Sequence, residues 1–151
     1  MAVTIRPAAP DDEAAVAFLA DAMGGHQGAA ENPAVGIVYR EALEDPRVRM
    51  LVAEDGGRVV GYAEVQARPY VLDGVRQGWL AALCVAPGRR GEGVGAALVE
   101  AVDAAAAAMG CDEVAVDSSS FRVDAHRFYR SAGFAEHRPA HRFRRTIRTR
   151  M

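Results

Sequence analysis

The sequence contains no lysine among its 151 residues, so its positive charge is carried by 18 arginines. This absence excludes a Walker A phosphate loop, in which a lysine and then Ser or Thr must follow the last glycine. Gly88 and Gly93 have the glycine spacing of that loop, but Val94 and Gly95 follow them. A phosphate site in this chain must therefore be built in another way.

Cysteine is also scarce, since Cys84 and Cys111 are the two in the chain. Two cysteines this far apart exclude a disulfide framework and a zinc site, and we expect no metal centre. A cysteine in an apolar run, as Cys84 is, usually serves as a small buried hydrophobic residue. The sequence also lacks a signal-peptide pattern and an apolar run of membrane-spanning length, so we expect a cytoplasmic protein with no membrane partner.

Net charge is low, at −2, and this argues against nucleic acid and membrane surfaces as partners. The charge is unevenly spread, because the segment Arg138–Arg150 carries six arginines and no acid. That segment is either a basic strand edge or a contact for an anionic partner. The length suits a single domain over residues 1–151 that buries its own core.

The most informative stretch begins at Trp79. Residues Trp79–Val85 are apolar and uncharged, which is typical of a buried strand. A turn over Pro87–Gly95 follows, with four glycines and the two arginines Arg89 and Arg90. Apolar residues then recur near helical spacing, at Val94, Leu98, Ala101, Ala105 and Met109. The pattern predicts a buried strand, a glycine-rich turn and a helix that begins at the turn.

This order of elements predicts an anion site. The first turn of a helix leaves backbone N–H groups without partners, and the helix dipole adds partial positive charge there. Glycines at 91, 93 and 95 let a phosphate approach the main chain, and the two arginines add fixed charge. A pyrophosphate is the ligand that best suits such a turn.

The rest of the chain predicts a mixed sheet with helices on both faces, an α/β class. We expect strands at residues 3–6, 49–54, 58–68 and 113–117, with a tight turn at 55–57. We expect helices that start near Asp11 or Asp12, span 35–43, and run from Ser120 or Asp124 to Ala132. Residues 69–78 are expected to form a loop or bulged connection, and residues 134–136 and 142–148 a final hairpin.

A dinucleotide-binding fold is one alternative for the turn. Gly91, Gly93 and Ala96 satisfy its fingerprint, and Asp117 could bind a ribose. However, residues 86–90 separate the strand from the first glycine, where that fold has a tight turn. Only 34 residues follow Asp117, which is too few for the remaining strand–helix units. An NAD-binding domain is therefore the weaker hypothesis.

Two segments resemble motifs of the GNAT superfamily of N-acetyltransferases. Residues Arg90–Gly95 are similar to its R/Q-x-x-G-x-G/A pyrophosphate loop, and Ala125–Phe134 to its A-x-x-F-Y-x-x-x-G-F segment. The two occur in the family's order, about 30 residues apart, in a chain of the family's length. The resemblance implies a GNAT-type sheet that is splayed at its centre, and acetyl-CoA as cofactor.

The resemblance also implies roles for individual residues. The pantetheine arm of coenzyme A would lie along the strand end, the N–H of Val85 would be the oxyanion donor, and Tyr129 would protonate the leaving thiolate. Expected cofactor contacts are Leu83, Cys84, Val85, Arg90, Gly91, Glu92, Gly93, Val94, Gly95, Ala96, Ser118, Phe128 and Tyr129. Arg122 stands where many relatives have Asn, and Ser118–Ser120 could replace that contact.

The general base and the acceptor stay open. Many relatives have an acid where this chain has Ala81 and Ala82, so the base is either a water chain or one of Asp117, Glu64, Glu31 and His26. The acceptor pocket is expected to use the 24–34 loop, the second helix and residues 69–78. These regions supply Glu31, Tyr39, Glu41, Tyr70, Asp73 and Trp79.

We therefore predict an acetyl-CoA-dependent N-acetyltransferase that acts on a primary amine. The acceptor could be a small amine, an amino-acid derivative, an antibiotic amine or a peptide N-terminus. A non-catalytic acyl-CoA-binding regulatory module is the rival hypothesis, because the strand lacks its carboxylate. A homodimer is a further expectation from the resemblance, with C-terminal strands that exchange or pair.

Overall fold

The computed structural model describes residues 3–22, 28–118 and 123–147. The chain divides into two compact units, Met1–Ser118 and Ser119–Met151. The expectation of one domain over residues 1–151 stays a prediction.

A five-stranded sheet forms the centre of the first unit, in the order β1-β2-β3-β4-β5. Its strands are β1 (Thr4–Pro7), β2 (Val48–Asp55), β3 (Arg58–Tyr70), β4 (Val75–Val85) and β5 (Glu113–Ala115). Neighbours from β1 to β4 pair antiparallel, whereas β4 and β5 pair parallel. The predicted mixed sheet is confirmed.

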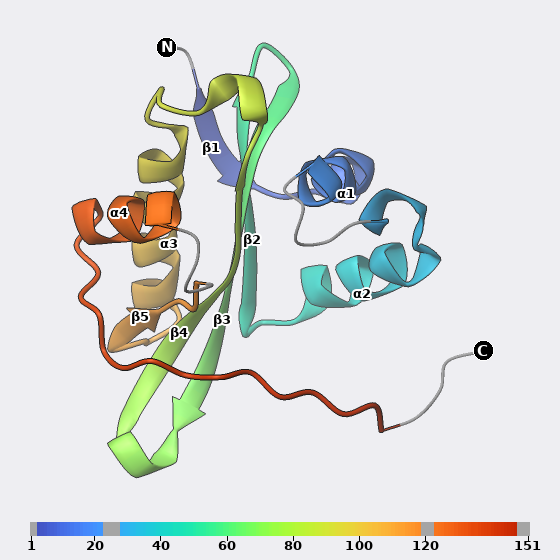
Figure 1. The fold of residues 1–151 in the computed structure, drawn as a ribbon. Helices are drawn as coiled ribbons and strands as arrows, with labels where there is room; N and C mark the ends of the chain where they lie inside the picture. Colours follow the sequence, from blue (N-terminus) through green and yellow to red (C-terminus); the bar gives the residue numbers. More distant parts are fainter. Residues whose placement is uncertain (1–2, 23–27, 119–122, 148–151) are drawn as a thin grey trace. The chain divides into compact units, whose positions relative to one another are not determined.

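Three helices cover this sheet, with α1 (Glu13–Ala22) and α2 (Pro33–Glu44) on one face and α3 (Val94–Ala108) on the other (Figure 1). Short 3₁₀ helices occupy Pro10–Asp12, Ala29–Glu31, Val71–Asp73 and Pro87–Arg89. The expected helix at 35–43 is α2, and the expected turn at 55–57 joins β2 to β3. The α/β class with helices on both faces is confirmed.

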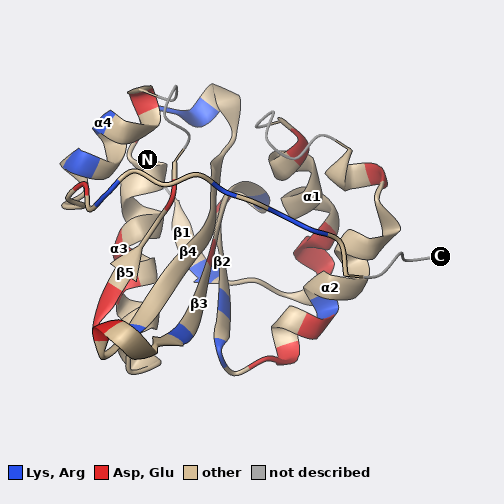
Figure 2. Cartoon of the chain, turned by 60° about the horizontal axis from the view of Figure 1, so that its bottom comes forward, with Lys and Arg blue, Asp and Glu red and all other residues tan. Residues whose placement is uncertain are grey.

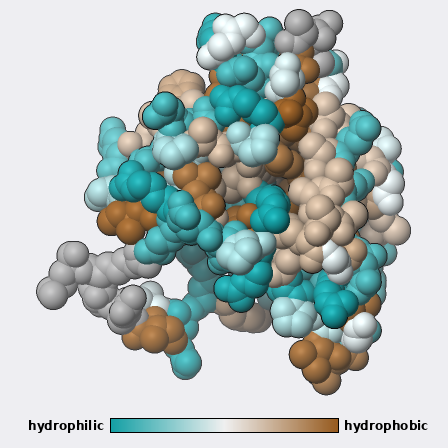
Figure 3. Space-filling model, turned by 180° about the vertical axis from the view of Figure 1, so that it is seen from behind, coloured by the Kyte–Doolittle hydropathy of each residue, from teal (hydrophilic) through white to brown (hydrophobic). Residues whose placement is uncertain are grey.

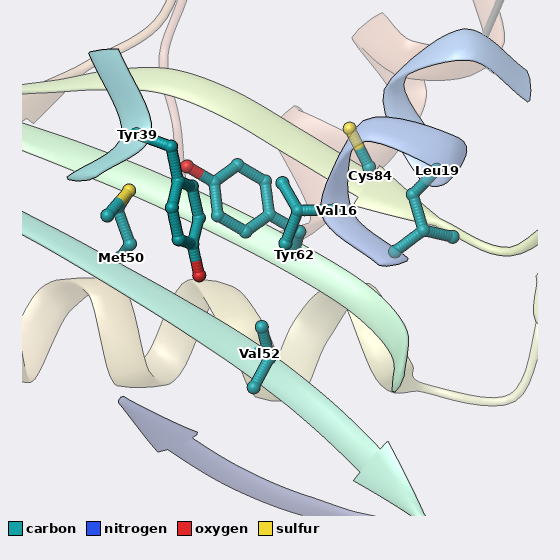
Figure 4. Packing of buried hydrophobic residues seen from close by; sticks show 7 residues of the cluster. All are labelled: Val16, Leu19, Tyr39, Met50, Val52, Tyr62 and Cys84. Atoms are coloured by element: carbon teal, nitrogen blue, oxygen red, sulfur yellow. The ribbon is translucent and has the colours of Figure 1, made fainter. Parts of the chain in front are cut away.

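The side of the sheet under α1 and α2 holds one compact core cluster (Figure 4). Met50 and Val52 of β2 face it together because alternate residues of a strand share a face. Cys84 is 3% exposed in this cluster, which confirms the prediction that it serves as a small buried hydrophobic residue. The cluster consists of Val16, Leu19, Tyr39, Met50, Val52, Tyr62 and Cys84.

Helix α3 packs on the opposite side of the sheet through a stripe that begins at Val94. Its buried residues are Val94, Leu98, Val99, Val102 and Ala106. The predicted stripe agrees at its first two positions and then lies one residue off, because Val102 and Ala106 rather than Ala101 and Ala105 face the sheet. Alanines make up much of the outer side of α3, which Figure 3 shows from behind as a pale-brown surface.

The expected loop at 69–78 is wrong. Strand β3 runs to Tyr70 and β4 begins at Val75, so only Val71–Gly74 connect them. Arg76 and Gln77 interrupt the apolar run in the sequence, yet the buried Gln77 bonds to Arg68 and Glu113 on the neighbouring strands. Cross-strand partners therefore extend the strand beyond its apolar part.

The second unit contains helix α4 (Val123–Ser131), which agrees with the helix expected to end at Ala132. The expected hairpin is not observed, because residues 134–147 form neither helix nor strand. Figure 2 shows blue segments and no red along the last part of this stretch, in line with its arginines. Side chains there, such as Phe143 at 91% exposed, have no strand partner in the described unit to bury them.

Candidate active site

A β-bulge divides strand β4 into two parts. Glu64 of β3 lies opposite Ala82 and Val65 lies opposite Leu80, so the intervening residue, Ala81, has no partner. Such a bulge bends a strand and often stands beside a functional site. Before it, Gln77–Trp79 pair with β3 and also with β5. After it, the described part of the chain pairs residues 82–85 with β3 alone, so the two strands separate there as the splayed fold requires.

The direction of the main-chain groups beyond the bulge follows from one hydrogen bond. The N–H of Ala86 donates to the carbonyl of Val60 on the β3 side, at 2.9 Å. Because successive N–H groups of a strand point to opposite sides, those of Leu83 and Val85 point away from β3. Cys84 points its main-chain groups toward Tyr62 of β3, its partner in the register. Leu83 and Val85 thus present donors on the open side, whereas Cys84 does not.

The glycine-rich turn after β4 has the conformation that its sequence suggests. Gly91 has a φ of 80° and Gly93 a φ of 86°, a left-handed region that glycine occupies without strain. Beyond chain neighbours, no atom lies within 4 Å of the place where a Cβ would stand on either residue. The outer side of the turn is therefore open to a ligand.

Helix α3 begins directly at this turn. Gly93 is its N-cap and supplies no side-chain hydrogen bond to the helix. The first helical bond runs from the N–H of Ala97 to the carbonyl of Gly93, so the amides of Val94, Gly95 and Ala96 precede the ladder. With the helix dipole, these donors make the turn suited to bind an anion, as the sequence predicts.

The two arginines of the turn differ in what they contact. Arg89 forms ion pairs with Asp55 and Glu92, both at 2.8 Å. It thus ties the turn to the β2–β3 connection and neutralises Glu92, whose charge would otherwise repel a phosphate. Arg90 is exposed, and among the described residues it has no ion-pair partner. Of the two, Arg90 is the arginine whose charge is available to a ligand.

Glu64 is the base candidate that lies beside the open strand. It is half-buried, its carboxylate accepts hydrogen bonds from Tyr62 and Gln66, and Ala82 lies opposite it on β4. Burial raises the pKa of Tyr62 far above its ordinary value, with a further contribution from the Glu64 carboxylate. The phenol therefore stays protonated and keeps donating to Glu64.

The other residues that the sequence predicted for the acceptor pocket or as a base differ in how deeply they are buried. Tyr39 is not on an acceptor surface, because it is buried in the core and donates to the carbonyl of Ala9 at 2.6 Å. Burial, together with the nearby carboxylates of Asp12 and Glu13, raises the pKa of Tyr39 to about 12. Among the other residues predicted for the site, Glu31, Glu41, Asp73 and Asp117 are exposed. Tyr70, Trp79 and Ser118 are half-buried. His26, Ser119, Ser120 and Arg122 lie outside the described residues.

Tyr129 and Phe128 belong to α4 in the second unit. The Tyr129 ring packs edge-on against Phe128 and Phe134, with centroid distances of 5.4 Å and 5.6 Å. This packing keeps the three aromatic residues of the A-x-x-F-Y-x-x-x-G-F segment together. Their roles toward a cofactor stay predictions.

Two features of the site were missed from the sequence. The bulge at Ala81 has no local signal, because it depends on how β4 pairs with β3. The second feature is a polar group in which Arg68 lies over the Trp79 ring at 4.5 Å and bonds to Gln77. Alternation along β3 and β4 could have placed these side chains on one face, had the extent of both strands been known.

Comparison with known proteins gives one family. A model described as the Acetyltransferase (GNAT) family matches residues 10–134. An aminoglycoside N(6′)-acetyltransferase type 1 from Stenotrophomonas maltophilia is 37% identical over 138 residues, which cover 89% of this chain and 88% of that protein. In the part of the chain that the structure describes, no helix is both long and apolar enough to cross a membrane.

Solved structures share the fold. A transcriptional regulator from Bacillus halodurans C-125 superposes with a TM-score of 0.86 at 23% identity, covering 95% of this chain and 99% of that one. AAC(6′)-Iy in complex with the bisubstrate analogue CoA-S-monomethyl-acetylneamine superposes with a TM-score of 0.84 at 22% identity. That match covers 97% of this chain and 100% of the other. At these identities the likeness concerns the fold alone.

Proposed function

The chain belongs to the GNAT acetyltransferase family, and from this premise we propose that it acetylates a primary amine of an aminoglycoside. It is an N-acetyltransferase, and its acetyl donor is acetyl-CoA. The family match extends from the first compact unit into the second, which supports our proposal that residues 1–151 act as a single domain.

One observation carries the proposed site: the open half of β4 leads directly to the uncapped N-terminus of α3. We propose that the amides of Val94, Gly95 and Ala96, with those of the turn at 91–93, hold the pyrophosphate. Arg90 would add the free positive charge. The outward main-chain groups of Leu83 and Val85 would hold the pantetheine arm in the gap beside β5.

The chemistry needs little covalent help from the protein. Acetyl-CoA supplies an acetyl group activated as a thioester; the acceptor nitrogen forms a bond to its carbonyl carbon as the carbon–sulfur bond breaks. The outward N–H of Val85 would stabilise the negative charge that develops on the acetyl oxygen. Tyr129 would donate its phenolic proton to the departing thiolate. The proton lost by the amine would pass to water or to a base that is not yet assigned.

Support for an aminoglycoside acceptor comes from the named relative. Its identity of 37% extends over nearly the full length of both chains, so it is more than a shared fold. An amino-acid derivative or a peptide N-terminus would be acetylated by the same chemistry. The acceptor therefore has to be tested against these classes directly.

The test is an acetylation assay on the purified full chain with acetyl-CoA and a panel of amines. The panel contains neamine, a simple monoamine, an amino-acid amide and a short peptide, and free coenzyme A thiol is measured. We expect turnover with neamine to exceed that with the other amines. Turnover confined to the peptide would contradict the proposed acceptor.

Binding without turnover on any amine would instead favour the non-catalytic acyl-CoA-binding module. A thermal shift with NAD but not with acetyl-CoA would revive the dinucleotide hypothesis, since a true ligand stabilises the folded state. The expected homodimer stays part of the proposal. It is tested by the mass of the protein in solution with and without residues 138–151.

A further inference from the structure

Glu64 lies on the face of β3 that α1 and α2 cover, two residues beyond the core residue Tyr62. The hydroxyl of Tyr62 donates to its Oε1 atom at 2.7 Å, and the side-chain amide of Gln66 donates to its Oε2 atom at 2.7 Å. Each carboxylate oxygen can accept more than one hydrogen bond. The group is therefore fixed in orientation while it keeps capacity for a further donor.

The charge of Glu64 is not balanced within the described part of the chain. No ion pair in that part of the chain includes Glu64, and both of its hydrogen-bond donors, Tyr62 and Gln66, are neutral. Its negative charge is therefore available to a cation that a ligand supplies.

The nearest positive residue on the same face of β3 is Arg68, and it is engaged elsewhere. Its guanidinium lies 4.5 Å from the centroid of the Trp79 ring and donates to the Gln77 Oε1 atom at 2.9 and 3.1 Å. Gln77 in turn donates to Glu113 at 2.9 Å. These contacts engage the Arg68 guanidinium with Trp79 and Gln77, and within the described residues it forms no ion pair with Glu64. The carboxylate is therefore left to an external cation.

The neighbours of Glu64 on β4 have small side chains. Ala82 lies directly opposite, and the bulged Ala81 is exposed, so neither side chain extends beyond a methyl group. Val85 lies three residues beyond Ala82, a distance of about 10 Å along the strand. A direct base must come within about 3 Å of the proton it removes, or reach it through one water. Glu64 is too far along the strand for that role at Val85.

We propose that Glu64 binds a second ammonium group of the acceptor, about 10 Å from the amine that is acetylated at the Val85 end. This inference rests on the proposed acetyltransferase function and narrows its acceptor. The preferred substrate carries at least two protonated amines separated by several bonds, as an aminoglycoside does. A monoamine reaches the reacting position without using Glu64.

Glu64→Gln removes the charge and keeps the shape. For neamine, we expect kcat/KM to fall roughly tenfold to hundredfold, mainly through KM, in line with the loss of a charged hydrogen bond. For glucosamine, which has one amine, we expect a change of less than about twofold, because a surface charge alone contributes little. Glu64→Asp retains the charge and should recover part of the neamine activity.

Glu100→Gln is the matched control, since it removes one exposed carboxylate from α3 and should leave both acceptors unaffected. Equal losses for neamine and glucosamine, with a fall in kcat and loss of the acidic limb of the pH profile, would overturn the proposal and make Glu64 a base. Unchanged kinetics would overturn it as well.

Neamine binding by calorimetry separates this proposal from the proposed function. Weaker binding to Glu64→Gln than to the wild type supports the subsite even if no amine is turned over, in which case the proposed function alone fails. Equal binding by the two proteins overturns the subsite whatever the activity.

Discussion

The two halves of strand β4 have different surroundings. From Gln77 to Trp79 the strand is paired on both sides, with β3 and with β5. Beyond the bulge at Ala81, in the described chain, it pairs with β3 only. In the first half, hydrogen bonds within the sheet use the main-chain groups, whereas in the second half alternate groups stay available. This unpaired edge inside the sheet is where we propose that coenzyme A binds.

Packing around the two halves differs as well. A Cβ on Gly78, in the closed half, would lie 3.2 Å from Ala106 and 3.3 Å from the carbonyl of Glu113. Gly88, just past the open half, has no such neighbour within 4 Å. The closed half is held tightly between α3 and β5, and the open half ends in a turn with free space.

The largest effect is expected from a proline at Val85. Val85→Pro removes an N–H that points away from β3, so the β3–β4 ladder should survive. Loss of an oxyanion donor typically lowers kcat about 10²- to 10³-fold, and we expect a fall of that size in steady-state assays at saturating substrates.

Neighbouring prolines sharpen the comparison. Leu83→Pro also removes an outward N–H, and we expect it to weaken acetyl-CoA binding with a smaller loss of kcat. Cys84→Pro removes a donor within the ladder and should destabilise the protein clearly more than Leu83→Pro in urea unfolding. If Val85→Pro folded and kept its full kcat, the oxyanion role would be refuted.

The second-largest effect is expected from a change in the second unit, the loss of the Tyr129 hydroxyl. Tyr129→Phe removes a phenolic proton donor and keeps the ring that packs on Phe128 and Phe134. We expect kcat to fall by roughly 10² or less, the range for a lost general acid. An unchanged kcat at saturating substrates would remove Tyr129 from the mechanism.

A charge at the phosphate end of the open half should have the third effect. Gly93→Asp places a carboxylate at the N-terminus of α3, and we expect acetyl-CoA to bind more than tenfold more weakly in calorimetry, by repulsion and loss of access. Gly93→Asn has a similar shape and tolerance for positive φ but no charge. It should therefore lose less affinity. Equal affinity of Gly93→Asp and the wild type would place the pyrophosphate elsewhere.

The smallest effect contrasts two glycine-to-alanine changes. Gly78→Ala overpacks the closed half and should lower the free energy of unfolding by roughly 1–3 kcal/mol, whereas Gly88→Ala should change it by less than about 0.5 kcal/mol. Urea unfolding measures both. A Gly78→Ala protein as stable as Gly88→Ala would show that the closed half is not tightly packed.

The sequence was informative where a local pattern determines structure. The apolar strand, the glycine turn and the start of α3 at Val94 follow from residue type and spacing alone, and the structure confirms them. The two motif segments likewise led to the family that the comparison confirms.

Features that depend on partners distant in the sequence were not predictable. The true start of β4 depends on the contacts of Gln77 with Arg68 and Glu113, and the bulge depends on register. The buried role of Tyr39 depends on its bond to Ala9 in another element. At the C-terminus, a final hairpin was expected at residues 134–136 and 142–148, but within the described second unit no strand pairs with them.

The most direct test is amide hydrogen exchange by NMR, with and without acetyl-CoA. In the free protein, the amide of Cys84 should exchange slowly while those of Leu83 and Val85 exchange quickly. Acetyl-CoA should then slow exchange at Leu83, Val85 and the amides of residues 93–96, with little change at Cys84. Slowing at other residues, with 83, 85 and 93–96 unchanged, would contradict the account.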